Sequence, residues 1–236
     1  MIGAPAPPAR VSLSASPAHV TLAAGTRTSV HVEAAASAGM ILRASVAGFE
    51  LDLRGRPRIV PSTDAASWLT LSPRRVFVGN TGATVVISSR RALAARPGDH
   101  SAIVLLTTTA PSSKGMVVRM RIGLVVTVRV KGRRIRNLVV ANARSRHAVR
   151  GASIDVALAN RGNVIESIDG SRLRVVLLRR GRVVARLRPG RRKVLPRTSA
   201  LVAVRYRGKL RGTVTARVEL TRAGGAVARR SFRVRL

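Results

Sequence analysis

The sequence has no cysteine, few aromatic residues and few acidic residues. Its 236 residues include one Trp, one Tyr and three Phe. The absence of cysteine excludes disulfide bonds, thiol catalysis and cysteine-ligated zinc sites. The scarcity of aromatic side chains removes the stacking platforms that proteins binding single-stranded nucleic acid use. No run of about 18 apolar residues occurs, so we expect no membrane-spanning helix in this chain.

Positive charge dominates what is present. The chain has 44 Lys and Arg against 9 Asp and Glu, a net charge of +35, and only four of the basic residues are Lys. Such a charge attracts anionic partners, among them nucleic acid, cell-wall polymers and acidic lipid head groups. The alternative is compositional bias, because Ala, Val, Arg and Gly dominate proteins encoded by GC-rich genomes. Residues 132–236 carry +24 of the charge and residues 1–131 carry +11.

Short stretches of alternating apolar and polar residues recur along the whole chain. In RTSVHVEAA, Val30 and Val32 share one face of a predicted strand, and Ser29, His31 and Glu33 share the other. Pro and Gly separate these stretches, and no window of 12 or more residues indicates an amphipathic helix. The pattern is typical of antiparallel β-sandwiches.

A charged segment at 130–138, VKGRRIRNL, interrupts the strand pattern and is the predicted linker. After it the pattern restarts, with hairpin turns predicted at Arg180-Gly181 and around Gly224-Gly225. We therefore predict an all-β fold of two tandem antiparallel Ig-like β-sandwiches, residues 1–131 and 132–236, each with about seven short strands.

Asp99, His100 and Ser101 are the three residue types of a hydrolytic triad, and they stand next to each other. Successive side chains on a strand point to opposite faces, so His100 would face away from both neighbours and could not relay a proton between them. We interpret this stretch as a turn that leads into a core strand. Because many Ig-like domains place a Tyr hydrogen bond at such a corner, we expect the His100 ring to bond a backbone carbonyl.

Other candidates for chemistry are equally sparse. His31 and Glu33 could share a strand face, but two ligands do not make a metal site. Glu50 and Asp52 also share a face, in a stretch that reads as an amphipathic strand with its acids outward. No phosphate loop, nucleophile elbow or zinc-protease motif occurs. We predict no catalytic, cofactor-binding or metal-binding residues and no enzymatic activity.

Several stretches together resemble a known kind of bacterial surface protein. They are LSASPAHVTLAAGTRTSVHV near the start, ASWLTLSPRRVFVGNTGATVVISS and PGDHSAIVLLTT in the middle, MVVRMRIGLVVTVRVKG before the linker, and ALANRGNVIES after it. The whole pattern resembles the extracellular part of the WxL-interacting cell-surface family, whose first domain is itself similar to periplasmic pilus chaperones. The resemblance implies Ig-like sandwiches and a binding task, with surface proteins and peptidoglycan as partners in that family.

The same resemblance singles out Arg119 and Arg121 as candidate partner-binding residues. They stand in the predicted last strand of the first domain, which in pilus chaperones takes part in β-augmentation. Residues 1–10, MIGAPAPPAR, resemble the Ala/Pro-rich stretch that follows a removed signal peptide. We therefore expect an extracellular or cell-envelope location.

Three functions remain open from the sequence. The first hypothesis is a secreted or cell-surface binding or structural protein of the bacterial envelope, which engages an anionic cell-wall polymer, another surface protein, or both. The alternative is a chaperone-like assembly factor that holds partner strands by β-augmentation. Third comes a non-specific nucleic-acid binder, because the charge would neutralise phosphates but no recognition motif is present. The oligomeric state and the identity of the partner stay open.

Overall fold

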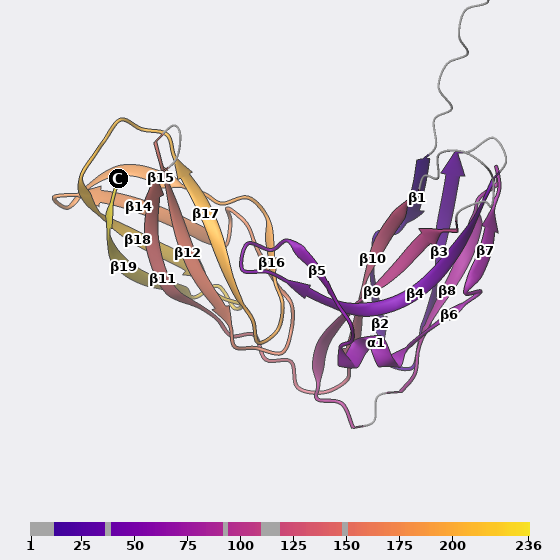
Figure 1. The fold of residues 1–236 in the computed structure, drawn as a ribbon. Coiled ribbons are helices and arrows are strands. Elements are labelled where there is room, and N and C mark those ends of the chain that lie inside the picture. The colour runs from indigo at the N-terminus through magenta and orange to yellow at the C-terminus, as the bar shows by residue number, and fades with distance from the viewer. Residues whose placement is uncertain (1–11, 36–38, 92–93, 110–118, 148–150) are drawn as a thin grey trace, which may run out of the picture. The chain divides into compact units, whose positions relative to one another are not determined.

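The computed structural model describes residues 12–35, 39–91, 94–109, 119–147 and 151–236 (Figure 1). The chain divides into two compact units. The first unit comprises Met1–Glu50, Ile59–Arg96 and His100–Lys131, and the second comprises Leu51–Arg58, Pro97–Asp99 and Gly132–Leu236. The sequence predicts a single division at 131/132, whereas in the structure the short pieces at 51–58 and 97–99 group with the second unit. The assignment of 1–131 and 132–236 as functional domains stays a prediction.

The described residues of the first unit form two β-sheets and one short helix. The bounds of its elements are β1 Ser12–Ser16, β2 His19–Ala23, β3 Arg27–Ala35, β4 Met40–Leu51, β5 Pro57–Val60, α1 Asp64–Trp68, β6 Leu69–Ser72, β7 Arg75–Val78, β8 Ala83–Ser89, β9 Gly98–Thr108 and β10 Arg121–Val130. One sheet has the order β1-β3-β8-β6. The other has the order β2-β10-β9-β4-β5, with β7 also paired to β4.

Two segments of the first unit pass from one sheet to the other. Strand β1 runs antiparallel to β3, and after Pro17 the chain continues as β2, which pairs in parallel with β10. Strand β6 pairs with β8, and after Pro73 the chain continues as β7, which pairs with β4. The peptide bonds that precede Pro17 and Pro73 are both cis. These crossings tie the two sheets of the sandwich together at two places.

Alternation along the strands builds the core of the first unit. Val30 and Val32 of β3 are fully buried, and the intervening His31 is exposed, as the pattern predicts. One apolar cluster includes residues from both sheets, among them Ile87 of β8 and Leu106 of β9. The sheets therefore pack face to face, as in an Ig-like sandwich.

Among its described residues the second unit, unlike the first, is built from strands alone. Their bounds are β11 Leu138–His147, β12 Ala152–Asn160, β13 Glu166–Ile168, β14 Leu173–Arg179, β15 Arg182–Leu187, β16 Arg192–Val194, β17 Ser199–Tyr206, β18 Thr213–Thr221 and β19 Val227–Arg235. The sheets have the orders β11-β12-β17, β13-β16 and β15-β14-β18-β19. A single apolar cluster joins the first of these sheets to the last, so the second unit also has a sandwich core.

Both hairpins predicted in this half are present. Arg179 pairs with Arg182, which leaves Arg180 and Gly181 as a two-residue turn with φ values of 48° and 79°. Positive φ at both turn residues is the geometry that matches the twist of the flanking strands. The hairpin of β18 and β19 closes over the Gly224-Gly225 loop, with Thr221 paired to Val227. The predicted all-β, Ig-like fold class is confirmed.

Candidate functional site

The candidate partner-binding surface is the beginning of strand β10. The parallel ladder with β2 covers Val125–Arg129, and the Val125 amide donates to the Ala18 carbonyl at its start. Strand β2 thus covers one edge of β10 only from Val125 onwards. Along the same edge at Arg121–Leu124, no strand of the described residues is paired. An unpaired edge presents backbone N–H and C=O groups that another strand can bind. This four-residue stretch is therefore a short template for strand addition.

Backbone alternation shows which groups the free edge offers. The Val125 amide and the Arg129 carbonyl both point towards β2. Because backbone groups alternate in direction with a period of two, the N–H and C=O groups of Arg121 and Gly123 point to the same side. The side chains of Ile122 and Leu124 pack towards the core of the sandwich, and Leu124 is buried. The free edge thus presents the backbone of two exposed residues over an apolar base.

The two predicted arginines lie at the start of this edge. Arg121 is the first residue of β10, whereas Arg119 lies two residues before the strand, so the prediction that placed both on the strand was wrong for Arg119. Both are exposed, and Arg121 Nε donates to Thr107 Oγ1 at 3.2 Å. Met120, between them, is bonded to β9 through Thr108. Among the described residues, no carboxylate lies within ion-pair distance of either guanidinium group.

In the apparent triad, His100 and Asp99 each have a structural partner, whereas the buried Ser101 Oγ has no hydrogen-bond partner among the described residues. His100 Nε2 lies 2.8 Å from the Arg96 carbonyl, as predicted, and since a carbonyl only accepts, Nε2 carries the hydrogen. The ring also contacts Trp68 edge-on, with centroids 4.9 Å apart. Asp99 belongs with 97–99 to the second unit, where its Oδ2 accepts a hydrogen bond from the Ile165 amide. These contacts hold a corner of the fold in place and do not form a proton relay.

The other sequence candidates have ordinary surface roles. His31 and Glu33 share a strand face and are both exposed, with His31 Nε2 3.6 Å from Glu33 Oε1. Among the described residues, no group of three or more potential ligands could hold a metal ion. Asp52 Oδ1 accepts a hydrogen bond from the Arg56 amide, and this bond lowers the pKa of Asp52. Asp52 therefore closes a turn.

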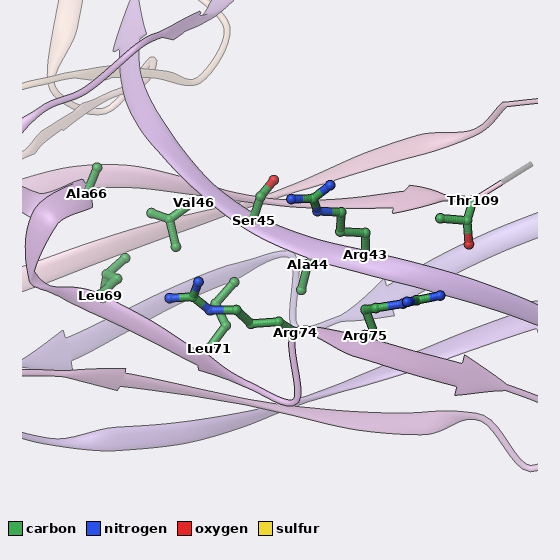
Figure 2. A pocket seen from close by; sticks show the side chains of 10 residues that line it. All are labelled: Arg43, Ala44, Ser45, Val46, Ala66, Leu69, Leu71, Arg74, Arg75 and Thr109. Carbon is green, nitrogen blue, oxygen red and sulfur yellow. The ribbon is translucent and has the colours of Figure 1, made fainter.

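A cavity of about 700 Å³ opens beside strand β4 in the first unit, and sequence reasoning did not find it (Figure 2). Its apolar lining consists of Ala44 and Val46 of β4, Ala66 of α1, and Leu69 and Leu71 of β6. Its polar lining consists of Arg43, Ser45, Arg74, Arg75 and Thr109. The cavity lies where the chain leaves β6 for β7 and so changes sheet.

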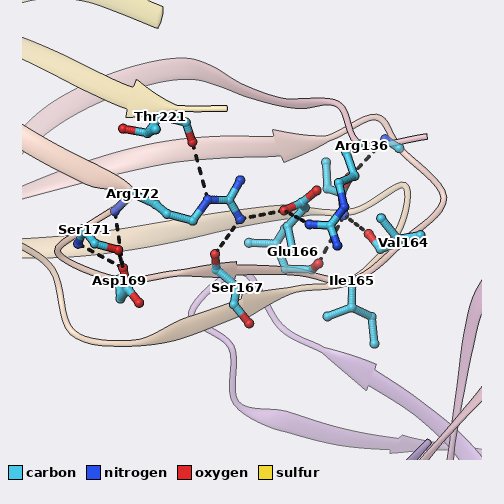
Figure 3. Close-up of polar contacts among 12 residues, drawn as sticks. Arg136, Val164, Ile165, Glu166, Ser167, Asp169, Ser171, Arg172 and Thr221 are labelled. Atoms are coloured by element: carbon cyan, nitrogen blue, oxygen red, sulfur yellow. Dashed lines mark hydrogen bonds and ion pairs between the residues drawn. The ribbon is translucent and has the colours of Figure 1, made fainter. Parts of the chain in front are cut away.

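The second unit contains a buried ion cluster, which sequence reasoning also missed (Figure 3). The Glu166 side chain is 1% exposed, and its Oε2 lies 2.6 Å from Arg172 Nη1 and 3.6 Å from Arg136 Nη1. Figure 3 shows the two guanidinium groups on opposite sides of this carboxylate. Arg172 also donates to the carbonyls of Ser167 and Thr221. The cluster links the segment before β11 to β13 and the start of β14.

Exposed arginines of the second unit lie along strand β19 and on strand β15. On β19, Arg229, Arg233 and Arg235 lie on one side of the strand alternation and are all exposed. On β15, Arg182 and Arg186 are also exposed, but a register shift between them interrupts the alternation. Among the described residues, Glu219 Oε1 lies 3.6 Å from Arg229 Nε. Part of the net charge of +24 in this half thus lies on an exposed face of β19.

Comparison with known proteins places the fold. No protein-family model matches the sequence, and no curated protein shows significant similarity to it. A chain in a chaperone–tip adhesin complex, described as vital for synergistic activation of CFA/I fimbriae biogenesis, has a TM-score of 0.58 at 11% identity; the match covers 93% of this chain and 98% of that one. The fold resembles that of fimbrial chaperones. The class 5 fimbriae chaperone CfaA has a TM-score of 0.54 at 13% identity, with the same coverages, 93% and 98%.

The chaperone-like fold covers both units of the chain, because each match extends over nearly its whole length. At 11% and 13% identity the similarity concerns the fold alone. None of the described helices is long and apolar enough to cross a membrane.

Proposed function

We propose that this protein is a chaperone-like assembly factor of the bacterial envelope that holds a strand of a partner surface protein by β-augmentation. The observation that carries the proposal is the free edge of β10 at Arg121–Leu124, in a sandwich whose fold resembles that of fimbrial chaperones. A partner strand added there would bond the backbone groups of Arg121 and Gly123. Its own polar or acidic side chains would meet the guanidinium groups of Arg119 and Arg121.

The length of the free edge limits what backbone bonds alone can supply. Four residues offer few bonds, and each contributes about 1 kcal/mol net. Apolar side chains must therefore provide much of the affinity. The alternation of Ile122 and Leu124 continues upstream in the sequence at Met116 and Val118, which lie outside the described residues. A partner strand with apolar residues at alternate positions is the expected ligand.

Binding by the full chain can be tested with peptides that match the terminal strands of surface proteins from the same bacterium. Replacing Arg121 by Pro removes an edge-facing N–H at the first residue of the strand, where Pro is tolerated, and also removes the guanidinium group. Replacing Arg121 by Ala removes only the guanidinium group. We expect Arg121→Pro to weaken binding more than Arg121→Ala does. Equal affinity of both variants and the wild type would contradict the proposal.

A second candidate function rests on the arginine faces of the second unit. The exposed arginines of β19 and β15 would give electrostatic adhesion to an anionic cell-wall polymer, which was the first hypothesis from the sequence. The two candidates differ in salt dependence. Polymer adhesion should be lost at high ionic strength because exposed charges are screened, whereas strand addition should depend weakly on salt. Equal binding to heparin, DNA and wall polymer would show that the binding depends on charge alone and is not specific for the wall polymer.

An extracellular or envelope location is part of the proposal, as is the absence of enzymatic activity. The resemblance of the fold to that of fimbrial chaperones supports both parts of the proposal. The resemblance to WxL-interacting proteins stays a hypothesis that rests on the sequence pattern alone.

A further inference from the structure

The cavity beside β4 combines an apolar interior with unpaired positive charge at its rim. Arg43 of β4 and Arg75 of β7 stand directly opposite each other in the antiparallel ladder, and Arg74 is the adjacent residue. Like charges at directly opposed positions are destabilising. Among the described residues, no carboxylate lies within ion-pair distance of any of the three. The rim is thus suited to an anion.

The directions of the three arginine side chains indicate where an anion would bind. In Figure 2 the guanidinium groups of Arg43 and Arg74 both extend to the side of the cavity where Val46 and Leu69 lie, and that of Arg75 extends away from it. Arg43 and Arg74 come from two different segments, joined where the Ala44 amide donates to the Arg74 carbonyl at 2.8 Å. An anion held between them would have the apolar lining directly beside it.

The shape of the opening favours a small molecule over a partner strand. The part of β4 that lines the cavity is Arg43–Val46, about 13 Å of extended chain. The β7 ladder ends at Arg43, and the four residues of β4 that line the cavity are fewer than the five to six of a typical strand. A volume of about 700 Å³ is within the range of ligand-binding pockets. The interior residues, among them Leu69 and Leu71, present no polar side chain to a ligand. They are suited to contact a hydrocarbon chain.

We propose that this cavity binds a fatty acid, with its hydrocarbon chain among Val46, Ala66, Leu69 and Leu71 and its carboxylate between Arg43 and Arg74. Burial of the chain in the apolar lining would supply most of the affinity. The two guanidinium groups would donate charge-assisted hydrogen bonds to the carboxylate. This site is separate from the free edge of β10, and its test does not depend on the proposed function.

The test is a titration of the full chain with laurate. Binding is measured by calorimetry and by the fluorescence of Trp68, which is the single Trp of the chain and stands two residues from Ala66. We expect saturable 1:1 binding. Dodecanol, which has the same chain without the charge, and acetate, which has the charge without the chain, should each bind at least about tenfold more weakly. Equal binding of laurate and acetate would overturn the proposal, because it would show attraction to charge only.

Matched variants separate this site from the general positive charge. The double variant Arg43→Gln/Arg74→Gln should weaken laurate binding about tenfold or more. The control Arg27→Gln/Arg58→Gln removes the same charge from two other exposed positions and should leave binding unchanged. An equal loss in both double variants would overturn the proposal.

A cavity-filling variant tests the position of the hydrocarbon chain. Ala66 is half-buried and lines the cavity, so Ala66→Phe should occupy the space and abolish laurate binding. Val46→Phe fills the same space from β4 and serves if Ala66→Phe fails to fold, as judged by its thermal unfolding. A folded filling variant that binds laurate with wild-type affinity would overturn the proposal.

Discussion

At the residue scale, the buried carboxylate of Glu166 is the most demanding group in the second unit. Its side chain is 1% exposed, and its Oε1 has no hydrogen-bond partner among the described residues. A buried charge is tolerated only when it is paired, because water no longer solvates it. Arg172 provides the closer and less exposed partner, with a side chain 23% exposed against 45% for Arg136. The two arginines should therefore contribute unequally.

Replacement of each arginine by Ala measures this inequality. Arg172→Ala should lower the free energy of unfolding by about 3 kcal/mol, because it leaves Glu166 buried beside one distant charge. Arg136→Ala should cost about 1 kcal/mol or less, as is typical of half-exposed ion pairs. Urea unfolding of the two variants and the wild type checks both values. Equal losses would contradict the assignment of Arg172 as the principal partner.

Asp169 provides a residue-scale prediction about pH. Hydrogen bonds from the Ser171 hydroxyl and then from the Ser171 amide lower the pKa of Asp169. A carboxylate with a lowered pKa stabilises the fold above the ordinary carboxyl pKa, and this contribution is lost as the pH falls through the lowered value. Ser171→Ala should raise the pKa of Asp169 towards the ordinary value. An NMR pH titration measures it, and an unchanged pKa would show that the hydroxyl does not act on Asp169.

At the element scale, the hairpins and strands follow from local sequence, whereas the clusters do not. Alternation with turn residues predicts β3 and the hairpin at Arg180-Gly181, because a strand period and a positive φ are local properties. The five residues of α1, Asp64–Trp68, are too few to show a helical period. Glu166 and Arg136 are 30 positions apart, and their meeting depends on tertiary packing. The cavity beside β4 likewise depends on where two strands diverge.

The turn between β14 and β15 gives two changes of opposite sign. A Cβ at Gly181 would meet no atom within 4 Å, so Gly181→Ala should destabilise through its φ of 79° alone, by about 1–2 kcal/mol. Arg180 has a φ of 48°, which Asn adopts more readily than Arg does. Arg180→Asn should therefore stabilise by about 0.5 kcal/mol. Chemical denaturation checks both, and a shift of the same sign for the two variants would contradict the turn geometry.

At the scale of the whole molecule, a net charge of +35 must be separated from specific recognition. The fold class follows from the sequence because alternation and turns extend through the chain. The roles of Arg119 and Arg121 stay predictions, since strand direction and edge exposure say which groups are available and not what binds them. Charge acts over distances near the Debye length, and strand addition acts through backbone contact.

The basic face of β19 gives a prediction at this scale. A triple change to Gln at its alternate arginines should weaken adhesion to an anionic wall polymer at low salt; these residues are Arg229, Arg233 and Arg235. The same change should leave peptide binding at the β10 edge nearly unchanged. Co-sedimentation with purified cell walls across a salt series measures adhesion. Undiminished adhesion in the triple variant would exclude this face as the polymer-binding surface.

Hydrogen exchange at the amides of Arg121 and Gly123 tests the central claim most directly. These two N–H groups point to the free edge of β10, so a bound partner strand should protect them from exchange. The Val125 amide, already bonded to Ala18, provides the internal reference. The account predicts that a strand peptide from a partner surface protein slows exchange at Arg121 and Gly123 and leaves Val125 little changed. Binding of that peptide without protection of either amide would contradict the account.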